Sequence, residues 1–295
     1  MAWRDFRQKP VVKCRCCGRI QSRGVWWPLR RRGRGVRMRG AWYCQADCLQ
    51  WALSEVLGRE PPGSRREAVV SHRVPLGLLL LSRQQLSAAQ LRTALDLQRA
   101  SGEGRIGDWL RHLGFASELQ ITAAVARQWA CPVLKTSPSA FAAGRFVALP
   151  NFLLESFQMI PVGFAEATRT LLIAFSESID HTMLYAVEQM LGYRTEACFV
   201  CPSILQKGLQ ALGQRHAAKD VVFDRLEDAG ECARIIGSYA AKVAAEEVRL
   251  APCGQHIWIR LEGRQREPVN LVLRSPGAAS SPAVPPLWHL PAAAV

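Results

Sequence analysis

Apolar residues recur at helical spacing through residues 75–98 and again through residues 105–128. In each stretch a serine, Ser87 or Ser117, precedes the second apolar series and has a glutamine three residues later, which is the pattern of a capping box. One face of the helix that follows is apolar in both stretches, at Leu91, Ala94 and Leu95 and at Ile121, Ala124 and Val125. The pattern predicts two tandem helix-turn-helix units around a shared core.

The two stretches are copies of one another at a constant offset of 30 residues. PLGLLLLSRQQLSAAQLRTALDLQ, the first copy (75–98), aligns with RIGDWLRHLGFASELQITAAVARQ, the second copy (105–128). The identical pairs are Gly77/Gly107, Leu80/Leu110, Ser87/Ser117, Gln90/Gln120, Ala94/Ala124 and Gln98/Gln128. The repeat is therefore an internal duplication.

Short strands and helices are expected to alternate after the duplication. The expected strands are Met159–Phe164, Thr170–Phe175 and Glu196–Cys201, and the expected helices are His181–Leu191 and Ser203–Leu212. The next part of the chain predicts a helix from Cys232 to Glu247 and then the strands Val248–Ala251, His256–Glu262 and Asn270–Arg274. In the middle strand of these three, Trp258 and Arg260 alternate with isoleucine and leucine, which is the period of a half-buried strand.

These elements predict an α+β protein with several domains. With 49% hydrophobic and 21% charged residues, the composition is that of a globular chain. The chain is expected to begin with a cysteine-rich basic module at 1–58 and a linker at 59–71. A domain at 72–218 follows, with its helical repeat at 72–132 and an α/β part at 133–218. A small αβ domain made of one helix and three strands at 219–275 and a flexible tail at 276–295 complete the division.

The positive charge is concentrated at one end of the chain. Residues 1–50 contain 13 lysines and arginines against two aspartates, a net +11 out of the +14 of the whole chain. The longest apolar run, Val74 to Leu81, is too short to span a bilayer, and the first residues show no signal peptide. We therefore expect a cytoplasmic protein, in which cysteines are reduced or bound to a metal.

The basic module carries two short cysteine pairs, Cys14-x2-Cys17 and Cys44-x3-Cys48, separated by residues 18–43. Two such pairs can bring four thiolates around one ion, and Zn²⁺ favours closed tetrahedral sulfur sites in structural roles. Gly18 suits the tight turn after the first pair. A structural zinc site is the prediction, with Cys16 as an alternative to Cys14 or Cys17.

The same module contains WWPLRRRGRGVRMRGAW, in which arginine is interleaved with tryptophan and glycine. This pattern is typical of grooves that bind single-stranded nucleic acid, and it also suits an anionic membrane surface, an acidic protein or a phosphorylated ligand. A solvated basic loop on a small zinc module explains it equally well. A further pair, Cys198-x2-Cys201, has no partner pair near it in the sequence and is interpreted as two unrelated thiols.

Packing accounts for the two helical hairpins but not for Arg105 before Gly107, nor for Gln98 and Gln128 at the ends of the copies. A glycine at a helix start lets an anion approach the backbone, and an arginine beside it pairs with phosphate or stacks on a base. A duplicated site of this kind suits a ligand that is itself two-fold.

The tandem pattern resembles the MshEN-type N-terminal domain of the ATPases of type II secretion and type IV pilus assembly. The motif of that family is Arg-Leu-Gly, aliphatic residues, Gly, further aliphatic residues and a terminal Gln. The second copy keeps the motif at Arg105, Ile106, Gly107, Gly114 and Gln128. The first copy keeps Leu76, Gly77 and Gln98 but has Pro75 in place of the arginine and Gln84 in place of the middle glycine, with Arg73 nearby and out of register.

This resemblance implies that these residues bind cyclic di-GMP and that the protein docks on secretion or pilus machinery. The sequence contains no G-x-x-x-x-G-K-[ST] motif of the ATPase core and no nucleophile paired with a base, and its six histidines stand alone without metal-type spacing. The expectation is a non-catalytic, cytoplasmic regulatory or adaptor protein. The alternative is a nucleic-acid-binding protein that uses the basic module and carries the rest as an oligomerisation scaffold.

Overall fold

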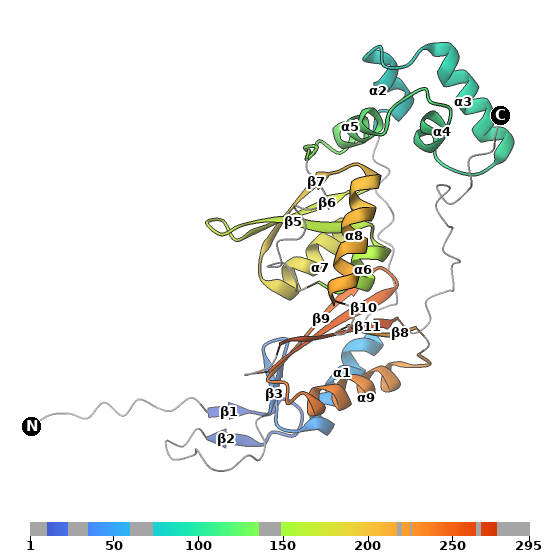
Figure 1. The fold of residues 1–295 in the computed structure, drawn as a ribbon. Helices are drawn as coiled ribbons and strands as arrows, with labels where there is room; N and C mark the ends of the chain where they lie inside the picture. Colours follow the sequence, from blue (N-terminus) through green and yellow to red (C-terminus); the bar gives the residue numbers. More distant parts are fainter. Residues whose placement is uncertain are drawn as a thin grey trace, which may run out of the picture. The chain divides into compact units, whose positions relative to one another are not determined.

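The computed structural model describes residues 11–22, 35–59, 73–135, 149–216, 220–224, 226–263 and 267–275. The chain divides into two compact units, one made of Met1–Ser64 with Ala218–Ala278 and the other of Arg65–Ala217 with Ala279–Val295 (Figure 1). None of the helices in the described ranges has the length and apolar character that crossing a bilayer requires.

The first unit is built around a six-stranded sheet to which both ends of the chain contribute. Its strand order is β4-β3-β9-β10-β11-β8. The strands are β3 (Val36–Met38), β4 (Ala41–Tyr43), β8 (Asp220–Phe223), β9 (Glu247–Cys253), β10 (His256–Glu262) and β11 (Val269–Arg274). The β3–β4 hairpin joins by parallel pairing of β3 with β9, in which Met38 lies opposite Val248 and the Arg37 amide donates to the Glu246 carbonyl at 2.8 Å. A separate hairpin, β1 (Val11–Lys13) and β2 (Ile20–Ser22), precedes them.

Two helices, α1 (Ala46–Arg59) and α9 (Ala229–Lys242), lie side by side against this sheet (Figure 1). Their apolar faces and one face of the sheet form a single core. Leu49 and Leu53 of α1 pack there with Ile236 of α9 and with Ile259 of β10, all of them at most 1% exposed. The segments 1–58 and 219–275, which the sequence analysis treats as separate domains, thus share one core, because neither has enough apolar surface of its own to bury.

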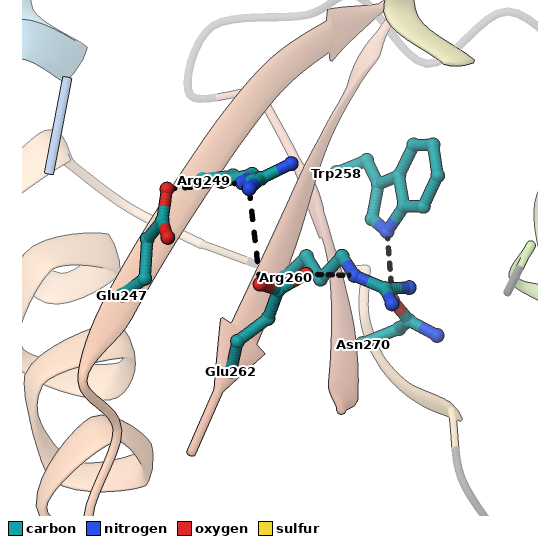
Figure 2. Close-up of polar contacts among 6 residues, drawn as sticks. All are labelled: Glu247, Arg249, Trp258, Arg260, Glu262 and Asn270. Atoms are coloured by element: carbon teal, nitrogen blue, oxygen red, sulfur yellow. Dashed lines mark hydrogen bonds and ion pairs between the residues drawn. The ribbon is translucent and has the colours of Figure 1, made fainter. Parts of the chain in front are cut away.

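The other face of the same sheet is also buried, which differs from the expectation of a half-buried strand. Trp258 is fully buried and Arg260 is 9% exposed. The Trp258 indole donates to Asn270 Oδ1 at 3.1 Å, and Arg260 Nε donates to Glu262 Oε1 at 2.7 Å (Figure 2). A hydrogen bond to β11 and one within β10 thus satisfy these polar groups, so β10 tolerates burial on both faces.

The second unit begins with the duplicated hairpins. They consist of α2 (Leu76–Ser82), α3 (Ala88–Ser101), α4 (Ile106–His112) and α5 (Glu118–Gln128). Both predicted capping boxes are confirmed: Ser87 and Ser117 each accept from the backbone amide three residues on, and the Gln90 and Gln120 side chains each accept from the serine amide. Leu80 and Leu110, related by the repeat, are fully buried in one shared core.

Among the described residues, the rest of this unit is a three-stranded sheet with three helices. Antiparallel β5 (Met159–Ala165) and β6 (Thr170–Phe175) are followed by β7 (Arg194–Phe199), which is parallel to β6. The helices are α6 (Asn151–Ser156), α7 (His181–Leu191) and α8 (Pro202–His216). The bounds expected for β6 and α7 are confirmed, whereas β7 begins and ends two residues earlier than expected, so that Cys201 lies beyond the strand.

The contact between α1 and α9 provides a test of the shared core. A Cβ on Gly237 of α9 would lie 2.6 Å from Gln50 Cγ of α1, whereas Gly58 of α1 faces open space. We expect Gly237→Ala to lower the free energy of unfolding by about 1 kcal/mol, because the Gln50 side chain must leave its place against α9. Gly58→Ala should raise it by about 0.5–1 kcal/mol. Urea unfolding of the full chain measures both, and stabilisation by both alanines would contradict the shared core.

Candidate functional site

The first cysteine pair lies in a tight turn between β1 and β2. The Gly18 amide donates to the Cys14 carbonyl at 3.0 Å, and the Cys14 amide donates to the Arg19 carbonyl at 2.8 Å. Gly18 has a φ of +73°, a conformation that glycine adopts without strain, as the sequence predicted. Cys44 follows β4 directly, and Cys48 lies in the first turn of α1. The sheet and the helix therefore position the second pair.

The four sulfur atoms of Cys14, Cys17, Cys44 and Cys48 lie within 4.8 Å of one another. Cys44 Sγ is 3.5 Å from Cys17 Sγ and 3.8 Å from Cys48 Sγ. Cys16 is exposed and is not part of this group. Of the alternatives left open by the sequence, the structure brings together Cys14 and Cys17.

This donor set fits a metal ion. Four thiolates at about 2.3 Å from a central ion, as in zinc sites, are about 3.8 Å from one another at the corners of a tetrahedron. Burial by itself would raise the pKa of the Cys14 thiol, but hydrogen bonds from the backbone amides of Cys17, Cys44 and Cys16 outweigh it and lower that pKa from 9.0 to about 6. The Cys44 amide, for example, lies 3.4 Å from Cys14 Sγ. The backbone thus favours the thiolate at Cys14, whereas burial raises the pKa of the Cys44 and Cys48 thiols.

The other thiols that the sequence singled out lie outside this cluster. Cys198 is buried in β7, and burial raises its pKa to about 12. Cys201 is partly exposed before α8, and burial raises its pKa as well. Of the arginine- and tryptophan-rich segment of the basic module (26–42), residues 26–34 lie outside the described residues, and the rest includes β3 and the start of β4.

In the second unit, two glutamines exchange hydrogen bonds between the copies. Gln98, at the end of the first copy, donates through Nε2 to the Gly104 carbonyl at 2.8 Å. Gln128, at the end of the second copy, donates through Nε2 to the Val74 carbonyl at 2.6 Å. The two donors, Gln98 and Gln128, are 30 residues apart, and so are the two acceptors, Val74 and Gly104. The two hydrogen bonds are therefore related by a pseudo-two-fold operation. The glutamines hold the segment before the first helix of the other copy.

The motif glycines are buried packing positions. A Cβ on Gly77 would lie 2.7 Å from Leu91 Cδ1, and one on Gly107 would lie 3.2 Å from Ile121 Cγ2. Leu91 and Ile121 are themselves related by the repeat. The glycines therefore allow the first helix of each copy to approach the second. The flanking apolar residues, Leu76 and Ile106, pack against the same core.

The middle glycine of the motif adopts a left-handed conformation. Gly114 has a φ of +67°, in the turn after α4. At the related position of the first copy, Gln84 adopts the same conformation with a φ of +55°. Outside glycine this conformation is unfavourable by about 1–2 kcal/mol. The loss of the glycine has therefore left the backbone turn unchanged and added strain to it.

Arg105 is the N-cap residue of α4, and its side chain reaches the α/β part of the unit. Its Nη1 donates to Oε2 of Glu177 at 2.5 Å. Glu177 lies in the loop between β6 and α7, and the Arg105 side chain is 65% exposed. A second link joins the two parts: Glu118 of α5 accepts from the Ser203 amide and from the Ser203 hydroxyl, both at 2.7 Å. The sequence gives no sign of Glu177, because 72 residues separate it from Arg105 and no motif marks it.

Neither a family model nor a curated protein matches the chain. Among solved structures, MshE with cdg (cyclic di-GMP) is 30% identical, with 47% of this chain and 98% of that chain covered and a TM-score of 0.37. Two crystal forms of the N-terminal domain of XpsE are 20% and 22% identical, with 46% of this chain and 92% and 93% of theirs covered and TM-scores of 0.33 and 0.28. By the identity and the coverage of MshE, about half of this chain belongs to the family of MshE-type N-terminal domains.

The cysteine cluster provides a test of metal binding. We expect the purified full chain to contain about one equivalent of metal and Cys44→Ser to lose it, because Cys44 Sγ lies 3.5 Å from Cys17 Sγ and 3.8 Å from Cys48 Sγ. Cys16→Ser is the matched control and should keep the metal, since its thiol is outside the cluster. Elemental analysis of the two variants decides, and loss of metal from Cys16→Ser alone would contradict this ligand set.

Proposed function

We propose that this chain is a non-catalytic regulatory or adaptor protein that binds cyclic di-GMP through its duplicated motif. The premise is its membership of the MshE-type family over about half of its length. The observation that carries the proposal is the second copy, which keeps a residue at every motif position: Arg105 is the N-cap residue of α4, Gly114 lies in the turn after it, and Gln128 ends α5 and holds the start of the first copy. Its Arg105 guanidinium is exposed and presents donors that suit a phosphate.

The symmetry of the site supports this ligand. The glutamine exchange relates the starts of α2 and α4 by a pseudo-two-fold operation. A cyclic dinucleotide has two phosphates and two bases related in the same way, so equivalent groups of the ligand meet equivalent segments of the protein. The side-chain amides of the two glutamines hold the backbone carbonyls of Gly104 and Val74. They thereby fix the direction in which the residues at positions 105 and 75 project.

For the cysteine cluster we propose Zn²⁺ in a structural role. All four donors are sulfur, which selects zinc over hard cations. Four protein ligands complete a tetrahedron and leave no position for a substrate, so the ion would hold the β1–β2 turn against the β4–α1 turn. The core of the first unit contains Cys14, Cys44 and Cys48, so the metal and the apolar core stabilise the same residues.

The first test is binding of cyclic di-GMP to the full chain by calorimetry. We expect Arg105→Ala to weaken binding about tenfold or more, because it removes a charge-assisted hydrogen bond to the ligand. Arg92→Ala, which removes an exposed arginine of α3 in the same repeat, is the matched control and should bind like the wild type. Absence of heat from the wild type at high micromolar concentrations would overturn the proposal.

A second test concerns the ion pair of Arg105. Its partner Glu177 must be displaced before Arg105 contacts a phosphate. Exposed ion pairs contribute about 0.2–1 kcal/mol, so Glu177→Gln should tighten cyclic di-GMP binding by roughly 1.5- to 5-fold. Glu196→Gln, on β7, makes the same change of charge at an exposed position and serves as the control. Weaker binding by Glu177→Gln would mean that this carboxylate contacts the ligand instead of competing with it.

A further inference from the structure

Arg73 lies two residues before the position where the first copy lacks its arginine. Its Cζ is 3.1 Å from the centroid of the Trp129 ring, a cation–π contact. Trp129 is the C-cap residue of α5 and directly follows Gln128, whose side chain holds the Val74 carbonyl. The hydrogen bond and the stacking contact therefore fix Arg73 against the end of the second copy.

Arg73 is held close to the start of α2. Val74 precedes a proline and is thereby restricted to extended conformations, and Pro75 itself has a φ of −53° and a ψ of 139°, which are polyproline II values. The Arg73 side chain therefore begins two residues before position 75, on an extended segment whose Val74 carbonyl is held by Gln128.

Arg105 and the Trp129 ring contact the same short segment of the α/β part. Arg105 pairs with Glu177, and the Trp129 ring that carries Arg73 is 5.9 Å from the ring of His181, the first residue of α7. Glu177 and His181 are four residues apart in the loop and helix start between β6 and α7. Two guanidinium groups are therefore held near one short segment, one from each copy.

We propose that Arg73 replaces the arginine missing at position 75 and supplies the guanidinium of the first copy to the second phosphate of the cyclic dinucleotide. Stacking on Trp129 occupies one face of the guanidinium and leaves its N–H edge to donate to a phosphate. Trp129 is a positioning residue, since it orders the arginine before the ligand arrives. This inference rests on the proposed function, because it assigns the first half of the same site.

The test compares cyclic di-GMP binding by the wild type and four variants of the full chain. Arg73→Ala should weaken binding about tenfold, as Arg105→Ala does, while the Arg92→Ala control remains unchanged. Adding Pro75→Arg to Arg73→Ala places an arginine in register and should recover most of the lost affinity. An arginine is compatible with this N-cap position, since Arg105 occupies the related one with a φ of −97° and a ψ of 151°.

The outcomes separate the inference from the proposed function. If the wild type and every variant fail to bind, the proposed function is wrong. If the wild type binds, Arg105→Ala weakens binding and Arg73→Ala does not, the site exists and this inference is wrong. If Arg73→Ala weakens binding but Pro75→Arg restores nothing, Arg73 serves the fold of the segment rather than the phosphate, which also overturns the inference. Unchanged urea unfolding of Arg73→Ala excludes a general loss of structure.

Discussion

Two side-chain amides bound to two backbone carbonyls are the constraint on which the candidate ligand site depends. Gln98 holds Gly104 and Gln128 holds Val74, so each copy of the repeat fixes the entry to the first helix of the other. A single hydrogen bond of this kind contributes about 1 kcal/mol, but the pair acts on the residues just before positions 75 and 105. Gly104 directly precedes Arg105 and Val74 directly follows Arg73, so each of these arginines starts from a backbone that a glutamine holds.

The duplication explains how one copy can lose motif residues without losing its fold. Buried Gly77 and Gly107 serve the packing of each hairpin and are kept in both copies. Pro75 suits the helix entry, and Gln84 accepts the left-handed turn that Gly114 adopts more easily. The changes at positions 75 and 84 of the first copy therefore alter the side chains available to a ligand and the strain of the turn. The packing glycines and the hydrogen bonds of the two glutamines are preserved.

The first unit shows a different dependence, between parts far apart in the sequence. The cysteine turns are small and polar, and their stability comes from the sheet and helices that carry them. Pairing of β3 with β9 and packing of α1 against α9 tie the N-terminal segment to residues 220–275. A metal at the cysteine cluster would lock two turns that this shared core has already brought together, with sulfur separations close to those of a tetrahedral site.

The sequence by itself determined what depends on local chemistry or on repetition. It predicted the capping boxes at Ser87 and Ser117, the bounds of β6, α7 and β10, the duplication and the four clustered cysteines, because side-chain period and spacing are written along the chain. Only the tertiary structure decided what lies across long separations. It excluded Cys16 from the cluster, joined both ends of the chain in one sheet, paired Arg105 with Glu177 and stacked Arg73 on Trp129. No spacing rule encodes such contacts, since they arise when separately formed elements bury their apolar faces together.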